Sequence, residues 1–238
     1  MSDQVLAGSV ALVTGASRGI GAAAAAELAR LGAHCVLLAR TQGGLEETDD
    51  GIRKLGGSAT LIPFDLRETD EIDKLGPSLA ARFGRLDVLV YAAGVLGRLA
   101  PVQHLLATEW TEALAVNATA GWRLIRTCDP LLRAAPAGRA VFVTAERART
   151  PRAYWACYGA TKAALDHVAL CWADEVESTT KLRVNLFDPG PVATRLRLAA
   201  FPGETQDHLR KPHEVAPALA ALCLPTEQRT GQRIRFEP

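Results

Sequence analysis

The sequence predicts an α/β fold: a doubly wound parallel β-sheet with helices on both faces, in a single domain. Short apolar runs alternate with longer helical stretches from one end of the chain to the other. Most of these runs are solidly apolar, which is typical of strands that helices cover on both faces. With 238 residues, 48% of them hydrophobic, and no linker or internal repeat, the chain can form one large domain over 1–238.

The predicted strands and helices alternate in the order that a parallel sheet requires. We expect strands at 10–14, 34–39, 59–63, 86–91, 139–144 and 182–187. We expect helices at 20–31, 45–55, 71–83, 108–132, 153–176 and 213–222. Gly32 and Gly84 directly follow two of these helices, where a left-handed helix end favours glycine. The segment 191–212 is less regular and is a candidate for a mobile lid.

The composition argues against several classes of function. Lys and Arg total 27 and Asp and Glu total 26, so the net charge of +1 disfavours a long basic surface for nucleic acid. No apolar run reaches the roughly 18 residues of a membrane-spanning helix, and the first residues do not resemble a signal peptide. Cys35, Cys128, Cys157, Cys171 and Cys223 are scattered, and the five histidines lack metal-ligand spacing. We therefore expect a cytoplasmic protein with reduced thiols and no metal, membrane or nucleic-acid partner.

The first predicted strand leads directly into a glycine-rich turn, residues 14–21, which opens an alanine-rich helix. Glycines at such a turn let the backbone pass close to a pyrophosphate, and the amides at the helix start attract its charge. A turn that needs glycine only for its own geometry is the alternative. The position after a buried strand favours a dinucleotide site in a Rossmann-like sheet, whose ligands bind at the carboxyl ends of the strands.

The glycine spacing Gly-x-x-x-Gly-x-Gly and the sequence Tyr-Gly-Ala-Thr-Lys at 158–162 together resemble the short-chain dehydrogenase/reductase family. Matches at 92–94, 189–190 and 230–232 extend the resemblance over essentially the whole chain. It implies that Asp65 and Leu66 border an adenine, that Ala93 and Gly94 line the ribose side, and that residues near 189–194 frame a nicotinamide. With the arginines discussed next, the expected cofactor site consists of Gly15, Ser17, Arg18, Gly19, Ile20, Gly21, Arg40, Asp65, Leu66, Ala92, Ala93, Gly94, Tyr158, Lys162, Pro189, Gly190, Val192 and Thr194.

The end of the second predicted strand indicates which nicotinamide cofactor binds. In this fold the adenosine ribose is recognised about 20 residues beyond the glycine turn, and an acidic residue there binds a free 2′-hydroxyl. This chain has Arg40 at that place and Arg18 inside the turn, and a guanidinium can hold a 2′-phosphate by paired hydrogen bonds. Arg40 as a solvated surface residue is the alternative. We predict NADP(H) over NAD(H).

Tyr158 and Lys162 are candidate catalytic residues, because a spacing of four places both side chains on one helix face. A free tyrosine has a pKa of about 10, and a nearby ammonium is expected to lower it towards the range useful for proton transfer. A surface tyrosine and lysine that share this spacing by chance are the alternative. The resemblance adds Asn117, which would help to hold a water that leads to Lys162, or which instead satisfies a local helix bend.

Two residues depart from the family pattern. The family has a serine thirteen residues before the tyrosine, and here that residue is Ala145. Thr144 is adjacent but points to the opposite strand face, so it substitutes only if an insertion shifts the register. The loss of one donor to a developing oxyanion commonly costs about 10²–10³ in rate. Tyr91 replaces the usual asparagine, and we interpret it as a β-favouring aromatic at a strand end.

Other polar and aromatic side chains have weaker claims to function. Glu146, Arg147, Arg149 and Arg152 lie between Ala145 and Tyr158, where the arginines either recognise an anionic substrate or, more often, form a solvated rim. Cys157 is either reactive or, more simply, a small buried residue. The tryptophans, which we expect in the core or at a subunit contact, are Trp110, Trp122, Trp155 and Trp172.

The residues together indicate an NADP(H)-dependent oxidoreductase that interconverts a carbonyl and an alcohol on a small-molecule substrate. Tyr158 is the expected acid/base, while Lys162 lowers its pKa and anchors the ribose, with Asn117 in support. The alternative, motivated by Ala145, is a sensor or structural protein that binds NADP(H) but has little or no activity. The resemblance implies a homodimer or homotetramer, and the predicted helix 153–176 has more apolar residues than one buried face needs.

Overall fold

A computed structural model describes residues 4–237, and its centre is a seven-stranded parallel sheet of order β3-β2-β1-β4-β5-β6-β7. The strands are β1 Val10–Thr14, β2 His34–Ala39, β3 Ser58–Pro63, β4 Val88–Tyr91, β5 Arg139–Val143, β6 Arg183–Asp188 and β7 Arg233–Arg235. The strand order reverses between β1 and β4, so a crevice opens at the carboxyl edge there. The predicted fold class is confirmed.

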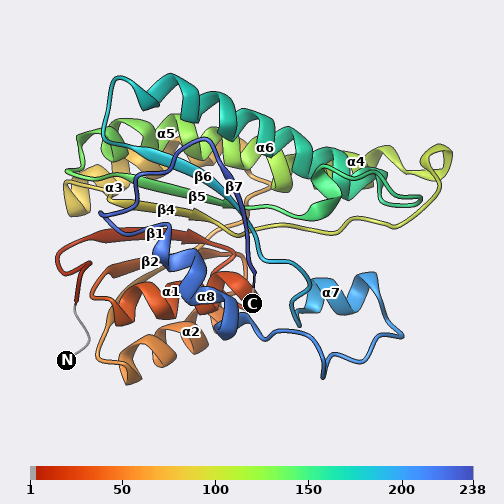
Figure 1. Ribbon diagram of the computed structural model, residues 1–238, viewed down its shortest axis with the longest axis horizontal. Helices are drawn as coiled ribbons and strands as arrows, with labels where there is room; N and C mark the ends of the chain where they lie inside the picture. The colour runs from red at the N-terminus through yellow and green to blue at the C-terminus, as the bar shows by residue number, and fades with distance from the viewer. Residues whose placement is uncertain (1–3, 238) are drawn as a thin grey trace.

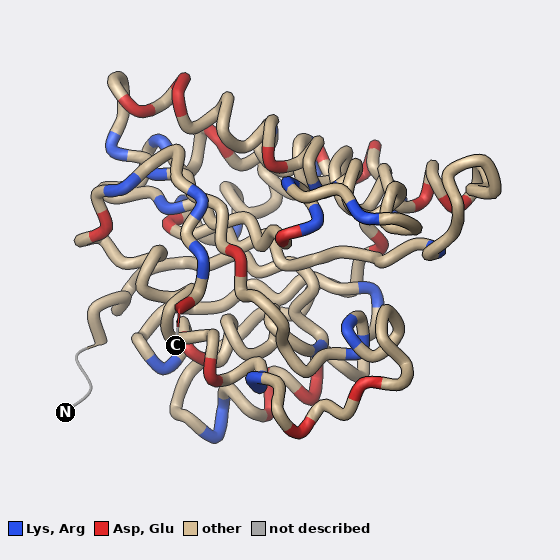
Figure 2. Tube along the Cα trace, turned by 45° about the vertical axis from the view of Figure 1, so that its right-hand side comes forward, with Lys and Arg blue, Asp and Glu red and all other residues tan. Residues whose placement is uncertain are grey.

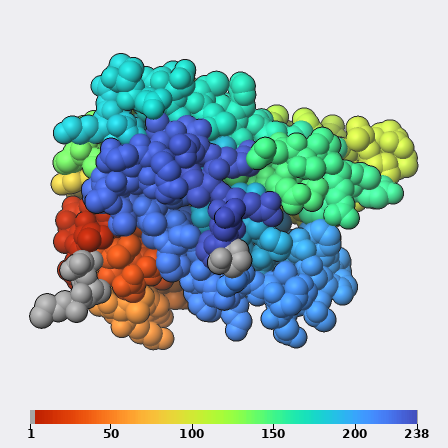
Figure 3. Space-filling model, in the orientation of Figure 1, coloured from red at the N-terminus to blue at the C-terminus, as the bar shows by residue number. Residues whose placement is uncertain are grey.

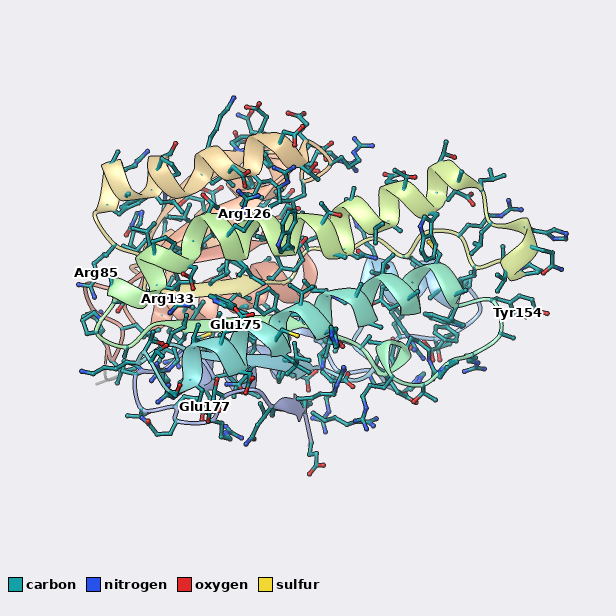
Figure 4. All side chains as sticks on the ribbon, turned by 90° about the horizontal axis from the view of Figure 1, so that it is seen from above. Arg85, Arg126, Arg133, Tyr154, Glu175 and Glu177 are labelled. Carbon is teal, nitrogen blue, oxygen red and sulfur yellow. The ribbon has the colours of Figure 1, made fainter. Side chains whose placement is uncertain are left out.

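Helices cover both faces of this sheet (Figure 1). On one face lie α1 Gly19–Arg30, α2 Gln42–Lys54 and α8 Pro212–Ala221, and on the other α3 Leu75–Phe83, α4 Ala107–Leu114, α5 Ala120–Ala134 and α6 Ala156–Glu177. Viewed from above, α5 and α6 run side by side across the sheet (Figure 4). Leu12 faces the core under α5 and α6, while Val13 faces the core under α1, so consecutive residues of β1 are both buried. The solidly apolar strands follow from these two cores.

Most predicted elements are present, with ends that differ by a few residues. Gly32 and Gly84 adopt the left-handed backbone expected of them, with φ of 101° and 69°. The predicted helix 71–83 is a 3₁₀ turn, Thr69–Lys74, followed by α3. The predicted helix 108–132 is interrupted by a π-helical turn, Ala115–Thr119, between α4 and α5. β7 was not predicted, because its sequence Arg-Ile-Arg lacks the apolar run that marks the other strands.

The candidate lid extends beyond the carboxyl edge of the sheet and contains a short helix, α7 Arg195–Ala200 (Figure 1). Arg197 forms two 2.6 Å hydrogen bonds to the carboxylate of Glu204, and Val192 pairs with Arg210 in an isolated bridge. The segment is therefore ordered by contacts of its own, and its movement stays a prediction. Within residues 4–237, no helix has the length and apolar character to cross a membrane.

Candidate active site

A cavity of about 730 Å³ opens at the carboxyl edge of the sheet. Its walls come from the glycine turn after β1, the ends of β2, β4, β5 and β6, the first turn of α6, and the segment 189–201. These segments are far apart in the sequence and meet because all strands are parallel. The cavity lies where a doubly wound sheet ordinarily holds its ligand.

The glycine turn forms one end of this cavity, and a side chain at Gly15 or Gly21 would clash with neighbouring backbone. Gly15 has a φ of +65°, and a Cβ there would lie 2.9 Å from the backbone of Ala93. A Cβ at Gly21 would overlap the carbonyl of Gly15. Arg18 precedes α1 without a side-chain cap, so no side chain within residues 4–237 caps the amides of the first turn. A backbone cradle at an uncapped helix start is suited to a pyrophosphate.

All predicted cofactor-site residues line this one cavity. They are Gly15, Ser17, Arg18, Gly19, Ile20, Gly21, Arg40, Asp65, Leu66, Ala92, Ala93, Gly94, Tyr158, Lys162, Pro189, Gly190, Val192 and Thr194. The Arg67 side chain binds Asp65 at 2.6 Å and holds the pKa of that carboxyl below its ordinary value. Arg18 and Arg40 are exposed, and no carboxylate within residues 4–237 pairs with either of them.

Tyr158 and Lys162 lie on the first turns of α6, and both are buried although both line the cavity. The Nζ of Lys162 donates a hydrogen bond of 2.5 Å to the carbonyl of Val143 at the end of β5. Burial lowers the pKa of Lys162 to about 8, against the opposing effect of the Asp166 carboxylate. Burial raises the pKa of Tyr158, and the carboxylates of Asp188 and Asp166 raise it further.

The expected direction of the Tyr158 pKa is therefore wrong. The expectation counted the charge of Lys162, whereas the cost of placing a phenolate in a buried site is larger. The same burial disfavours the ammonium of Lys162, which weakens its influence on the phenol. Tyr158 is held in its protonated form, which is the form that can donate a proton.

Asn117 lies in the π-helical turn and is fully buried, but it does not line the cavity. Its amide binds both backbone groups of Val95, at 2.8 and 2.9 Å, and donates to the hydroxyl of Thr161 at 2.9 Å. The Tyr91 hydroxyl donates to the carbonyl of Val116 in the same turn. Asn117 thus connects the segment after β4 to α6, and Tyr91 fixes the turn that carries it.

Thr144 does not take the place of the missing serine. Its hydroxyl donates to the Asp166 carboxylate at 2.6 Å and accepts from Arg233 at 3.0 Å, and Arg233 also pairs directly with Asp166. Thr144 and Ala145, the next residue, both line the cavity. The Thr144 hydroxyl is therefore engaged inside the protein, and Ala145, at the position of the family's serine, has no hydroxyl to offer.

The loop before α6 contributes residues to the cavity that sequence reasoning ranked low. Arg147, Arg152 and Trp155 line the cavity and Arg149 does not. The expectation of a core or subunit contact is wrong for Trp155, whose place three residues before Tyr158 on a loop after a strand could have indicated the site. Trp172 is buried in the core, as expected.

Cys157 is buried, and burial raises the pKa of its thiol, so it fits the interpretation as a small buried residue. In the part of the chain that the structure describes, no group of three or more His, Cys, Asp or Glu side chains could hold a metal ion.

Known proteins share this arrangement. A family model described as short chain dehydrogenase matches residues 9–205. The uncharacterized oxidoreductase YciK of Escherichia coli K12 is 33% identical over 233 residues, which is 96% of this chain and 92% of that protein.

Two solved structures have the same fold with a bound cofactor. A short chain dehydrogenase from Shigella flexneri 2a, complexed with NADP, superposes with a TM-score of 0.93 at 31% identity and covers 99% of this chain and 100% of its own. One from Escherichia coli CFT073, complexed with NADPH, gives 0.92 at 31% identity, with 100% of both chains covered. The match of the family model over most of the chain shows that this protein belongs to the short-chain dehydrogenase/reductase family.

Proposed function

We propose that this protein is an NADP(H)-dependent oxidoreductase that interconverts a carbonyl and an alcohol on a small molecule. One observation carries the proposal. Tyr158 and Lys162 line the same cavity as the glycine turn, although they are about 140 residues away from it in the sequence. A proton donor and a dinucleotide cradle in one cavity are what such a reaction requires.

The residues present fit an NADP(H) molecule. Gly15 and Gly21 leave the space that side chains would fill, and Arg18 and Arg40 offer guanidinium groups without a carboxylate partner within residues 4–237. The arginines would hold the 2′-phosphate, and Asp65 and Leu66 would border the adenine. Ala92, Ala93 and Gly94 would line the ribose side, with Pro189, Gly190, Val192 and Thr194 around the nicotinamide and the nearby phosphate. When bound, the nicotinamide would supply or accept the hydride.

Two further observations support NADP(H) over NAD(H) as the cofactor. The two relatives described above were crystallised with NADP and NADPH. In this chain, Arg40 follows β2 where an acidic side chain would repel a 2′-phosphate. Fluorescence titration is expected to give tighter binding of NADPH than of NADH. Equal or tighter binding of NADH would contradict the assignment.

In the reductive direction, Tyr158 donates its phenolic proton to the substrate oxygen as that oxygen gains negative charge. The phenol carries its proton at neutral pH, as an ordinary tyrosine does, and burial raises its pKa further. Lys162 has a pKa of about 8 and can return a proton towards the phenol while it anchors the ribose. Asn117 acts by holding the segment after β4 against α6, beside Tyr158.

This chain provides one fewer hydrogen-bond donor to the substrate oxygen than the family's usual set of residues does. Ala145 offers no hydroxyl, and the Thr144 hydroxyl is bound to Asp166 and Arg233. The loss of a single donor of this kind lowers the rate about 10²–10³-fold. Enzymes lower activation barriers by about 8–23 kcal/mol in total, so this loss weakens catalysis without abolishing it. Turnover is therefore expected to be slow but measurable.

Replacement of Tyr158 tests the proposal. In Tyr158→Phe, turnover of NADPH with aldehydes and ketones should fall at least about 10²-fold, because the general acid is lost. The affinity for NADPH should stay within twofold of the wild-type value. Tyr154→Phe is the matched control, since Tyr154 is 58% exposed and points outward at the end of the loop before α6 (Figure 4). Unchanged turnover in Tyr158→Phe refutes the role of the phenol.

Ala145 also favours a second candidate function, a protein that binds NADP(H) with little or no activity. Ready turnover of any carbonyl compound by the wild type excludes it. Tight NADPH binding without turnover, in the wild type and in Ala145→Ser alike, favours it.

We propose a homodimer or homotetramer in a reducing compartment such as the cytoplasm. Leu106, Trp110 and Trp122 are exposed apolar side chains at α4 and α5, which supports a contact between copies there. All five cysteines are free, and four of them are buried. Sedimentation equilibrium should give a dimer or tetramer mass, and a monomer at micromolar concentration would contradict the assembly.

A further inference from the structure

Two segments that lie beyond Tyr158 form the part of the cavity that the dinucleotide would leave free. One is the loop 145–155 before α6, and the other is α7 with the Phe201 that follows it, residues 195–201. Figure 3 shows the two segments, green and blue, one above the other at the right-hand side of the molecule. The rings of Trp155 and Phe201 make contact across them, with centroids 5.6 Å apart. These segments enclose the space in which a substrate would meet the phenol.

The surface of this space nearest the phenol is apolar and aromatic. Trp155 stands edge-on to the Tyr158 ring, with centroids 6.0 Å apart. Leu196, Ala200 and Phe201 of the opposite segment also line the cavity. A substrate with a planar or apolar body would bury surface against these side chains.

Arginines stand at the edge of the apolar surface. Arg147 lies over the Trp155 ring at 5.9 Å and is close to Glu146, whose carboxylate is 3.3 Å away. Arg197 of α7 is already bound by Glu204. Arg152 lines the cavity, and within residues 4–237 no carboxylate oxygen lies within 4.0 Å of its guanidinium, the limit for an ion pair. Its guanidinium can therefore bind an anion without first leaving a protein partner.

The distribution of charge leaves arginines without a carboxylate partner in the substrate part of the cavity. Basic and acidic positions alternate over most of the chain, as Figure 2 shows, which fits the net charge of +1. Of the arginines that line the substrate part of the cavity, Arg147 pairs with Glu146, and Arg197 pairs with Glu204, which lies outside the cavity lining. Two arginines in that part have no carboxylate partner within residues 4–237: Arg152, on the same loop as Trp155, and Arg195, at the start of α7.

We propose that the substrate is an anionic carbonyl compound with an aromatic or apolar body, and that Arg152 binds its carboxylate. The proposal rests on the function proposed above and adds the class of substrate. A guanidinium presents parallel N–H donors that match a carboxylate, and its charge is permanent at physiological pH. With the apolar body against Trp155, the anion bound to Arg152 would orient the carbonyl group towards Tyr158. A neutral ester of the same shape would gain only the apolar contact.

Binding of matched acids and esters tests the proposal without turnover. The probes are benzoylformate with its methyl ester, and 4-formylbenzoate with its methyl ester. Each is titrated by calorimetry into wild-type protein saturated with NADP⁺, since the oxidised cofactor cannot reduce them. In at least one pair the acid should bind about tenfold more tightly than the ester, and added salt should reduce that ratio.

Single substitutions assign the anion preference to a residue. Arg152→Gln should bring the acid-to-ester ratio close to one, because it removes the charge at similar size. Arg149→Gln is the matched control, since Arg149 is an exposed arginine of the same loop that does not line the cavity, and it should keep the ratio. A ratio near one in both wild-type pairs, no binding of either acid, or an unchanged ratio in Arg152→Gln overturns the proposal and leaves Arg152 as a solvated rim residue.

Failure of the proposed function gives a different result. If the acids bind tightly through Arg152 but NADPH is not oxidised in their presence, the anion site stands and the reductase assignment fails. If the esters are reduced as readily as the acids and Arg152→Gln reduces both equally well, the reductase assignment stands and the anion site fails.

Discussion

Replacement of Ala145 by serine tests whether the missing donor limits the rate. Ala145 leaves β5 in an extended backbone, with φ of −153° and ψ of 156°, which any residue adopts. Its side chain lines the cavity of about 730 Å³, so one added oxygen atom has room. The substitution therefore adds a hydroxyl near Tyr158 without moving the strand.

The expected gain in rate in Ala145→Ser depends on the hydroxyl groups already present at the end of β5. The Thr144 hydroxyl is bound to Asp166 and Arg233, so the end of β5 gives the wild type no hydroxyl for the substrate oxygen. A preorganised donor of this type is worth about 3–4 kcal/mol when it is removed from a site built around it. A newly introduced donor is less well oriented, and we expect a gain of about 10- to 100-fold.

Steady-state kinetics with NADPH and a panel of aldehydes and ketones measures this gain. Because the new hydrogen bond strengthens as the oxygen gains charge, kcat should rise while KM changes little. Ala148→Ser is the matched control, since Ala148 lies on the same loop but does not line the cavity. The gain should disappear in a protein that also carries Tyr158→Phe. Equal kcat values in Ala145→Ser and Ala148→Ser, or a change confined to KM, would refute the reasoning.

Other consequences of the structure can be measured independently. The pKa of Lys162 is about 8 in the folded chain and about 10.4 when the side chain is exposed. Between about pH 8 and 10.4 the unfolded chain therefore binds more protons than the folded chain, so the free energy of unfolding rises with pH over this range. Relative to Lys162→Met, the urea-unfolding free energy of the wild type should gain about 2 kcal/mol between pH 7 and pH 10, and a constant difference would contradict this. Tyr91→Phe removes the donor to a buried carbonyl and should lower stability by about 1–3 kcal/mol, whereas the exposed Tyr154→Phe should have no measurable effect. Arg40→Asp should weaken NADPH binding at least about tenfold and strengthen NADH binding, and an unchanged preference would exclude Arg40 from cofactor selection.

The sequence predicts the parts of the fold that depend on local pattern. Buried strands such as Val10–Thr14 are recognisable because both faces need apolar residues, and the glycine turn because its position follows from the strand before it. The predicted cofactor residues line one cavity because parallel strands all end at one edge, so the residues that follow them meet.

What the sequence leaves out depends on contacts between distant segments. The network of Thr144, Asp166 and Arg233 joins β5, α6 and β7, and nothing local in the sequence relates these residues. The direction of the Tyr158 pKa depends on burial, which the spacing of Tyr158 and Lys162 does not reveal. The π-helical turn at Asn117 continues a helical pattern without a break, so the sequence reads as one long helix.

The fate of the transferred hydrogen tests the central claim, that Tyr158 acts as the proton donor in a hydride transfer within this cavity. NADPH that carries deuterium at both C4 positions of the nicotinamide is incubated with the protein and a carbonyl compound that oxidises unlabelled NADPH, and the alcohol is analysed by mass spectrometry. We expect one deuterium on the carbinol carbon with the wild type, and at least about 10²-fold less labelled alcohol with Tyr158→Phe under the same conditions. Alcohol without deuterium, or equal labelling by the two proteins, would contradict the account.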